Sequence, residues 1–388
     1  MTGDSLYQFC LLTNYLFFKP MKNLFRLTAV ACWLLMLSGC GGGDDAPDKI
    51  KPTNLTLSSD ISEDGTGLVS FTATADNAAK YYFSFGDGSA DLESTDGTED
   101  HTYATSGTYS VRVVAKSTDL IGVEKSINVE VEVAISDEGY KTELTHEGYA
   151  LVWNDEFTET TLNSENWKHE TGGGGWGNHE LEYYQAANTK VKDGYLTITA
   201  KKESAGGMSY TSSRIVSAGK KDFKYGRIDI RAILPKGQGL WPALWMLGSS
   251  IGNPPWPACG EIDIMEMIGG SGRENTVYGT PHWSDPNGNH ASLNSNHEVV
   301  LSSGTFADKF HVFTIIWTDT RIDWYMDDVK FGSGINTTPS DLTEFNEKFF
   351  FIMNVAVGGD WPGSPNSSTV FPQRMVVDYV RVFQEQEG

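Results

Sequence analysis

The stretch PPWPACGEIDIMEMIGG, residues 254–270, places three acidic residues inside a run of isoleucine and methionine. This alternation predicts a β-strand, in which side chains at positions i and i+2 share one face. Glu261 and Asp263 therefore point to one face, and the isoleucines between them point to the other. Glu266 would fall on the isoleucine face of a regular strand. We predict a β-bulge at Ile264-Met265 that returns Glu266 to the acidic face.

Three carboxylates on one face of a strand indicate a functional site. Buried acids without partners are costly, and like charges repel, so at least one of Glu261, Asp263 and Glu266 should keep its proton near neutral pH. Carboxyls with unequal pKa values suit the cleavage of a glycosidic bond, where one is the nucleophile and the other donates a proton. A calcium site and an acidic surface strand are the alternatives that the spacing leaves open.

The residues around this strand favour a carbohydrate-binding cleft. Sugar rings stack their C–H faces on flat apolar surfaces, while their hydroxyls need polar partners. Tryptophans would supply the flat surfaces and nearby polar side chains the hydrogen bonds. The flanking tryptophans are Trp241, Trp245, Trp256 and Trp283, and the polar candidates are Asn178, Glu182, Arg214 and His282.

The acidic strand belongs to a large all-β domain, which we predict at residues 148–386. Strand-like patterns follow one another here, glycine turns separate them, and helical periodicity is almost absent. A segment of this size and pattern predicts one antiparallel sandwich of the jelly-roll type. The polar stretch at residues 137–147 is expected to be a linker from the preceding domain.

A second, smaller β-domain is predicted at residues 52–136. This segment has no tryptophan and shows alternating runs such as LVSFTATA, residues 68–75, which predict a small β-sandwich. The FGDG turn at residues 85–88, followed by HTY and GTY within residues 101–109, resembles the polycystic-kidney-disease (PKD) type immunoglobulin-like domain. The resemblance implies a spacer or a weak binding module.

The first 51 residues predict targeting rather than a folded domain. Residues 21–40 combine a positive start, an apolar core too short to span a bilayer as a helix, and the ending LSGC. This ending resembles a bacterial lipobox, which implies lipidation of Cys40 and a lipoprotein held at the outer membrane or cell surface. An ordinary signal peptide containing Cys40 is the alternative. Residues 1–20 fit the signal badly and indicate a start codon assigned too early, and residues 41–51 form an acidic tether.

Charge and cysteine content narrow the range of partners. With 29 basic and 51 acidic residues, the chain has a formal net charge of −22 and is repelled by nucleic acid and anionic surfaces. A neutral polymer suits it better, although the charge is equally well explained by the solubility of a secreted protein.

The mature chain would keep only Cys40 and Cys259, so no disulfide is expected, and Cys259 is interpreted as a small buried apolar residue. We expect a monomer.

Further motifs run through the whole of the larger domain. They include LVWNDEF at 151–157, GGWGNHELEYY at 174–184, NVAVGGDWPG at 354–363 and DYVRVF at 378–383. Together with the ExDxxE pattern of the acidic strand, they resemble glycoside hydrolase family 16 and, within it, the bacterial laminarinases, which are endo-β-1,3-glucanases. The resemblance implies a concanavalin A-like jelly roll and a retaining double displacement. In that mechanism Glu261 is the nucleophile, Glu266 is the general acid/base, and Asp263 tunes their charge.

The resemblance also implies a substrate and its contacts. A β-1,3-glucan of the laminarin type is the expected substrate, and mixed-linkage β-glucan and agarose remain open, while the negative charge of the chain suits sulfated carrageenan poorly. A β-glucan-binding protein without activity is the competing class. No cofactor is expected for catalysis. The positions matching family contacts to sugar are Asn178, Arg214, Trp241, Trp245 and His282.

A structural calcium ion on the convex side is a further implication of the resemblance. Its ligands would be Glu156, the Gly194 carbonyl and Asp378. An oxygen-only ligand set suits a hard cation. In the alternative reading, Glu156 and Asp378 are simply exposed acids of a turn and a strand.

Overall fold

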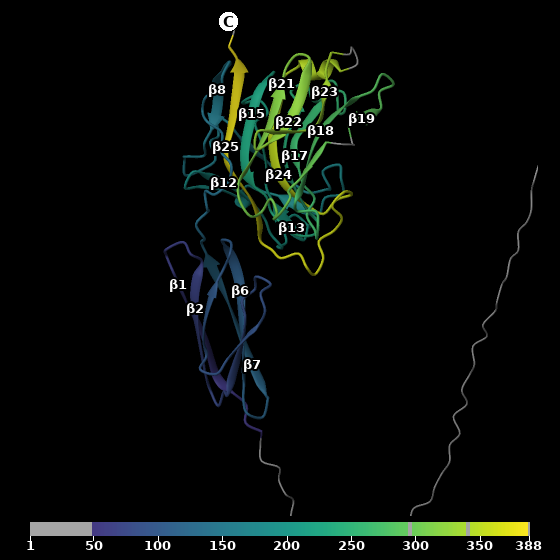
Figure 1. Cartoon of the computed structure of the whole chain (residues 1–388). Coiled ribbons are helices and arrows are strands. Elements are labelled where there is room, and N and C mark those ends of the chain that lie inside the picture. The colour runs from purple at the N-terminus through teal and green to yellow at the C-terminus, as the bar shows by residue number, and fades with distance from the viewer. Residues whose placement is uncertain (1–48, 294–296, 339–341, 387–388) are drawn as a thin grey trace, which may run out of the picture. The chain divides into compact units, whose positions relative to one another are not determined.

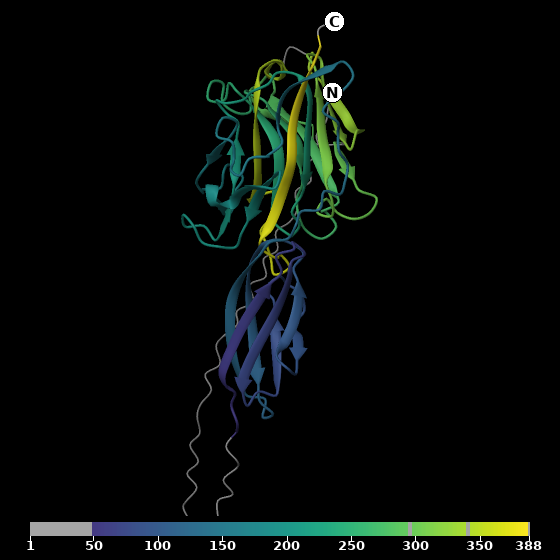
Figure 2. The same cartoon turned by 90° about the vertical axis from the view of Figure 1, so that its left-hand side faces the viewer.

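The computed structural model describes residues 49–293, 297–338 and 342–386, which form two β-sandwich domains (Figures 1 and 2). The predicted signal peptide, the lipidation site Cys40 and most of the tether lie outside the described residues, so these remain predictions. The described chain is nearly all β, as predicted, and its helical structure consists of two short 3-10 turns, η1 (Ala186–Asn188) and η2 (Thr343–Asn346). None of the described helices has the length and apolar character needed to cross a membrane.

The smaller domain is the predicted immunoglobulin-like sandwich. One sheet has the order β1-β2-β5 and the other the order β4-β3-β6-β7. Its strands are β1 (Thr53–Ile61), β2 (Leu68–Asp76), β3 (Lys80–Ser84), β4 (Leu92–Ser94), β5 (Thr98–Thr102), β6 (Gly107–Lys116) and β7 (Gly122–Val131). The FGDG turn is fixed by Tyr103, whose hydroxyl donates to the Phe85 carbonyl, and by the His101 ring, which stacks on Phe85. His101 also pairs with Asp87, so both polar residues have turn and packing roles.

The larger domain consists of two eight-stranded sheets and a short parallel pair. We call the first the β25 sheet. Its order is β11 (Thr189–Lys192), β12 (Tyr195–Ala200), β25 (Gln373–Glu385), β15 (Gly226–Ile233), β21 (His311–Trp317), β22 (Arg321–Met326) and β23 (Val329–Asn336), with β8 (Tyr149–Asp155) also paired to β25. In Figure 1, β25 is the long yellow strand between β8 and β15.

The second sheet, which we call the β17 sheet, carries the acidic strand. Its order is β19 (His290–Ser292), β18 (Thr276–Ser284), β17 (Glu261–Glu266), β16 (Leu240–Gly248), β24 (Phe349–Val357), β14 (Arg214–Val216) and β9 (Lys168–Glu170), with β20 (Glu298–Val300) also paired to β18. The parallel pair is β10 (Glu182–Tyr184) with β13 (Tyr210–Ser212). The apolar core contains side chains of both sheets, such as Ile230 and Val380 from one and Leu244 and Met353 from the other. This is the predicted jelly-roll sandwich.

Strand β17 contains the predicted bulge. Asp263 pairs with Trp245 of β16, and Met265 pairs with the next residue, Leu244, so Ile264 is left without a partner. As a result, Ile264 and Met265 are both buried in the core. Glu266 is thereby returned to the face that carries Glu261 and Asp263.

The carbonyl freed by the bulge has a partner from the other sheet. The indole Nε1 of Trp324, on β22, donates a hydrogen bond of 2.8 Å to the Asp263 carbonyl. Gly279 of β18 lies opposite the bulge, and a Cβ atom there would come within 2.2 Å of the Trp324 ring. A buried carbonyl needs a partner, so the bulge depends on this indole and on the missing side chain at Gly279.

The segment 137–147, predicted as a linker, is tied to the larger domain. Arg231 is fully buried, and its guanidinium donates to the Asp137 side chain and to the Tyr140 carbonyl. Thr142 donates its backbone N–H to the Tyr379 hydroxyl. The polar composition of this segment therefore reflects its partners in the larger domain, which extends back to residue 137.

Replacement of Trp324 by phenylalanine should expose the dependence of the bulge on this indole. Trp324→Phe leaves the Asp263 carbonyl buried without a partner, which should lower the free energy of unfolding by about 1–3 kcal/mol. Amide hydrogen exchange should accelerate at Met265 and Glu266. Trp317→Phe is the matched control, because Trp317 is equally buried and donates to the Phe345 carbonyl. Equal exchange at the bulge in both variants would contradict the assigned role.

Candidate active site

A single cross-strand row of residues carries much of the candidate site across the β17 sheet. Arg214 pairs with Asn354, Asn354 with Ala243, Ala243 with Glu266, and Glu266 with Tyr278. Directly paired residues project to the same face of a sheet. The bulge therefore places Glu266 in register with Arg214, and the small side chain of Ala243 separates Glu266 from Asn354.

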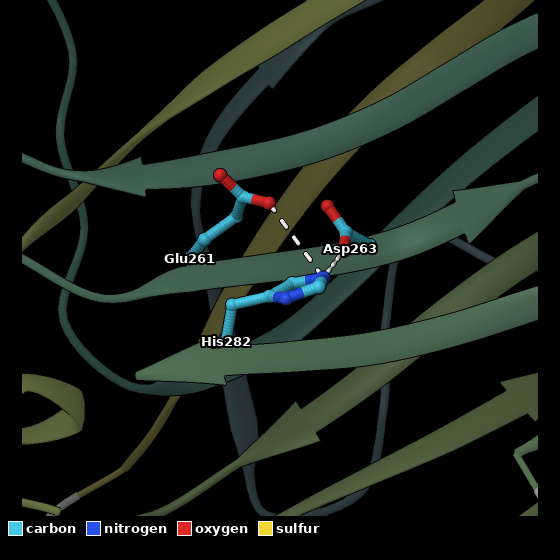
Figure 3. Close-up of side chains that lie close together, drawn as sticks. All are labelled: Glu261, Asp263 and His282. Atoms are coloured by element: carbon cyan, nitrogen blue, oxygen red, sulfur yellow. Dashed lines mark ion pairs between the residues drawn. The ribbon is translucent and has the colours of Figure 1, made fainter. Parts of the chain in front are cut away.

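Glu261, Asp263 and His282 form an acid–imidazole cluster beside this row (Figure 3). His282, on β18, pairs directly with Glu261. Its Nε2 lies 2.9 Å from Asp263 Oδ2 and 3.7 Å from Glu261 Oε1. The other oxygen of Glu261 accepts a hydrogen bond of 3.1 Å from Trp256 Nε1. The hydrogen bond from Trp256 and the charge of a protonated His282 therefore both stabilise the Glu261 anion.

Burial makes it difficult to ionise all three acids together. Burial, followed by the charge of Asp263, raises the pKa of Glu261 to about 8, and the same causes raise the pKa of Glu266 to about 8. Burial also raises the pKa of Asp263 well above its ordinary value. At neutral pH the cluster therefore keeps at least one proton.

The hydrogen-bond donors distinguish the two glutamates, although their pKa values do not. Trp241 Nε1 donates to Glu266 at 2.9 Å, whereas Glu261 has both Trp256 and His282 nearby. The pKa values of Glu266 and Glu261 are raised alike, because burial and Asp263 act on both. The proximity of His282 to Glu261 nevertheless favours Glu261 as the anion and Glu266 as the proton carrier.

The predicted sugar-contact residues on β16 lie on the same face as the acids. Trp241 and Trp245 are both partly exposed and stand four positions apart on β16, where Leu244 points into the core. Trp245 donates to the Asn354 side chain at 2.8 Å, and the Arg214 guanidinium lies 4.8 Å from its ring centroid. Trp256 is 44 % exposed. These tryptophans are available to a ligand.

Two candidates from the sequence do not reach this face. Glu182 is fully buried, and its carboxylate accepts a hydrogen bond of 2.6 Å from the Val357 backbone N–H, so its role is to hold strands together. Trp283 packs against the core beside Phe345 and is not a flat platform for a sugar. Asn178, by contrast, is exposed, and its carbonyl accepts from the Asp360 N–H.

Sequence reasoning missed two aromatic or imidazole residues at the site. Trp361 is 40 % exposed and meets the rings of Trp241 and Tyr278 edge-on, with centroids 5.5 and 5.2 Å away. Its signal was available, since it belongs to the NVAVGGDWPG motif. His290 contacts His282 and comes from a polar turn, DPNGNHAS, which carries no chemical pattern.

The predicted calcium ligands come together on the β25 sheet. The registers Leu196↔Val377 and Asp155↔Val380 place Gly194, just before β12, and Glu156, just after β8, at the part of β25 that carries Asp378. Burial raises the pKa of Asp378, and the charges of Asp137 and Glu156 add to this effect. Each carboxylate also has an arginine partner, Arg381 for Glu156 and Arg231 for Asp378. The oxygen atoms of this set suit a hard cation, which would share the two carboxylates with these arginines.

Comparison with known families agrees with this arrangement. Residues 178–381 match the model of "Glycosyl hydrolases family 16", and residues 56–131 match the PKD domain model. A beta-glucanase of Rhodothermus marinus is 41% identical over 249 residues, covering 61% of this chain and 85% of that protein. The clotting factor G alpha subunit of Tachypleus tridentatus is 38% identical over 244 residues, 61% of this chain and only 34% of that protein. The chain thus spans about a third of one relative and most of the other.

A solved structure shows the same fold. The laminarinase catalytic domain of Thermotoga maritima is 42% identical and superposes with a TM-score of 0.56, covering 62% of this chain and 100% of that domain. The similarity therefore lies in the larger domain.

The raised pKa of Glu266 predicts a stability that falls with rising pH. The folded state holds the Glu266 proton up to a pKa of about 8, whereas the unfolded chain releases it near 4.5, so unfolding becomes easier as pH rises between these values. Glu266→Gln cannot ionise and should be more stable than the parent at pH 8 by at least about 1 kcal/mol, but not at pH 4. Thermal unfolding at both pH values tests this. Glu165→Gln, at an exposed position, is the control, and an equal gain in that variant would contradict the assignment to Glu266.

Proposed function

The chain belongs to glycosyl hydrolases family 16, and we propose that it cleaves internal bonds of laminarin-type β-1,3-glucan by a retaining double displacement. The observation that carries the proposal is the placement of Glu261 and Glu266 on one face of β17, each with an indole donor. The identity of 42% to a laminarinase catalytic domain supports the choice of substrate.

The first step would be attack of the Glu261 carboxylate on the anomeric carbon. As the glycosidic C–O bond breaks, Glu266 gives its proton to the leaving oxygen, and a covalent glycosyl-enzyme forms. In the second step, the Glu266 carboxylate takes a proton from water, which attacks the same carbon and releases Glu261. Two inversions leave the β configuration of the product unchanged.

The neighbours of the glutamates would prepare these two protonation states. Trp256 donates its N–H to Glu261, and His282 lies 3.7 Å from it at ion-pair distance, so both favour the charged form that a nucleophile requires. The buried Asp263 is 2.9 Å from His282 and opposes the ionisation of both glutamates. Asp263 would therefore help to keep one glutamate protonated, and the nearby His282 would make Glu261 the charged one and Glu266 the proton carrier.

The tryptophans would hold the glucan on either side of the reacting bond. Trp241 and Trp361 are in contact at one end of the cross-strand row. Trp245, on β16, is in contact with Arg214, on β14, at the other end. Flat indole faces suit the C–H faces of glucose, and the Arg214 fork and the exposed Asn178 suit its hydroxyls.

Two alternative functions can be tested by one experiment. Another neutral polysaccharide, such as mixed-linkage β-glucan or agarose, would be cleaved by the same acids. A glucan-binding protein without activity would bind but release no reducing ends, although Glu261 and Glu266 are both present. Digestion of laminarin, lichenan and agarose in parallel separates these cases, and release from laminarin is the expected result.

The roles of the two glutamates can be separated by azide rescue. With an activated aryl β-laminaribioside and azide, Glu261→Gly should yield the α-glycosyl azide, because azide takes the space of the missing nucleophile. Glu266→Ala still forms the intermediate and should yield the β-azide. Each variant should lose at least about a thousandfold in kcat on laminarin.

Proton NMR of the first product and of the azides checks this assignment. The β-anomer should appear first from laminarin. An α-anomer appearing first would mean inversion of configuration and refute the double displacement. Azides of swapped configuration would show that Glu261 and Glu266 have each other's roles.

We also propose that calcium stabilises the fold through Glu156, Gly194 and Asp378, without taking part in catalysis. Calcium bound only to the folded chain raises the melting temperature by mass action. Chelation should therefore lower the melting temperature of the parent chain. Asp378→Asn should lose this response to chelator, whatever its own stability after the loss of the Arg231 ion pair. A melting curve that is identical for metal-stripped and calcium-loaded parent would refute the site.

The location and surroundings of the enzyme remain predictions from the sequence. We propose that Cys40 carries lipid and holds the enzyme at a bacterial membrane, with β-glucan as its polysaccharide partner. The PKD domain would act as a spacer between the membrane and the catalytic domain. A monomer is sufficient for this role.

A further inference from the structure

His290 has no part in the proposed chemistry, yet it lies beside the acid–imidazole cluster. Its Nε2 is 2.7 Å from Nδ1 of His282. The pairs His282↔Ser292 and Ser284↔His290 make the two histidines diagonal neighbours on one face of the β18–β19 hairpin. Their rings are nearly parallel, with centroids 5.0 Å apart. The hairpin therefore holds the imidazole of His290 against the imidazole of His282.

The nitrogens of His282 cannot be used independently. A neutral imidazole has one donor and one acceptor nitrogen, and the partner of one nitrogen fixes the state of the other. Nε2 of His282 lies 2.9 Å from Asp263 and 3.7 Å from Glu261, as Figure 3 shows, so a charged Glu261 favours a proton on Nε2. Nδ1 must then accept, and His290 Nε2–H is the donor beside it. When His282 is charged, its Nδ1–H donates to an unprotonated His290, so one proton lies between the rings in either state.

His290 also supports the second donor to Glu261. The His290 ring lies 4.7 Å from the Trp256 ring, and Trp256 Nε1 donates to Glu261 Oε2. Two routes therefore lead from His290 to the acids, one through His282 and one through Trp256. Neither route includes Glu266, whose indole donor is Trp241.

We propose that His290 is a positioning residue for the nucleophile, fixing the His282 proton toward Asp263 and Glu261 and supporting the indole that donates to Glu261. The proposal rests on the proposed function, since it takes Glu261 as the nucleophile. His290 acts only through His282 and Trp256 and does not touch the reacting atoms. Its loss should therefore make Glu261 harder to ionise and affect Glu266 less, because Glu266 is reached only by the charge of His282 and not by Trp256.

The test separates the hydrogen bond of His290 from its packing. His290→Phe keeps a flat ring against Trp256 but removes both nitrogens. We expect kcat on laminarin to fall roughly tenfold, the factor that corresponds to one charge-assisted hydrogen bond, with KM changed by less than about twofold. The acid limb of the kcat/KM profile should move to higher pH, and the alkaline limb should move less.

Two further variants serve as rescue and control. His290→Gln carries an amide N–H at a similar reach and should restore most of the lost kcat. Asn289→Ala removes a contact with Asp285 in the same turn without touching either imidazole, so it should keep the parent values. A parent-like kcat and pH profile in His290→Phe would overturn the proposal. A loss confined to KM would make His290 a sugar-binding residue instead, and an equal loss in the Phe and Gln variants would exclude the hydrogen bond as the cause.

A measurement without substrate decides the same point independently. Nitrogen-15 NMR of the histidines in the full chain should show His282 protonated at Nε2, with a hydrogen-bonded Nδ1 whose shift changes in His290→Phe. Unchanged His282 shifts in that variant would overturn the proposal, whatever its activity. A parent chain that releases nothing from laminarin would instead refute the proposed function, and the NMR result would still decide the role of His290.

Discussion

The hydrogen bond from Trp324 to the Asp263 carbonyl is the constraint on which the site depends. A bulge is tolerated inside a packed sheet only if its freed backbone group finds a partner, and here the partner crosses the core from the opposite sheet. Without the bulge, Glu266 would be buried among apolar side chains and Met265 would face outward. The geometry of the acidic face therefore depends on two residues in the core below it. These are Trp324 and Gly279, whose missing side chain leaves space for the indole.

The electrostatics of the site follow from the same placement. Little water surrounds the carboxyl groups of Glu261 and Glu266 where they stand on the sheet. Their burial therefore disfavours the charged forms. Among the described residues, indole and imidazole N–H groups, rather than lysine or arginine side chains, lie against these carboxyl groups. The indoles of Trp241 and Trp256 and the imidazole of His282 lower the cost of charge on Glu266 and Glu261 while leaving room for a neutral sugar.

Much of the site was predictable because it lies on strands with a strict two-residue period. The bulge at Ile264-Met265 followed from the positions of three acids relative to isoleucines, and burial agrees with it. Glu182 was misplaced because its strand pairs in parallel behind the site, a pairing that local pattern does not encode. His290 was missed because a diagonal contact across a hairpin depends on register, which the turn sets and the composition does not.

The burial of Arg231 bears on how the catalytic module can be moved between proteins. Its guanidinium is enclosed, and part of its coordination comes from residues 137–147, ahead of the first strand of the larger domain. Excision at residue 148 would therefore remove several hydrogen-bond acceptors of the Arg231 guanidinium, which is buried when residues 137–147 are present. The functional boundary of the module lies ahead of Asp137. A recombination event that transfers only the strands of the sandwich, without residues 137–147, would produce an incomplete domain.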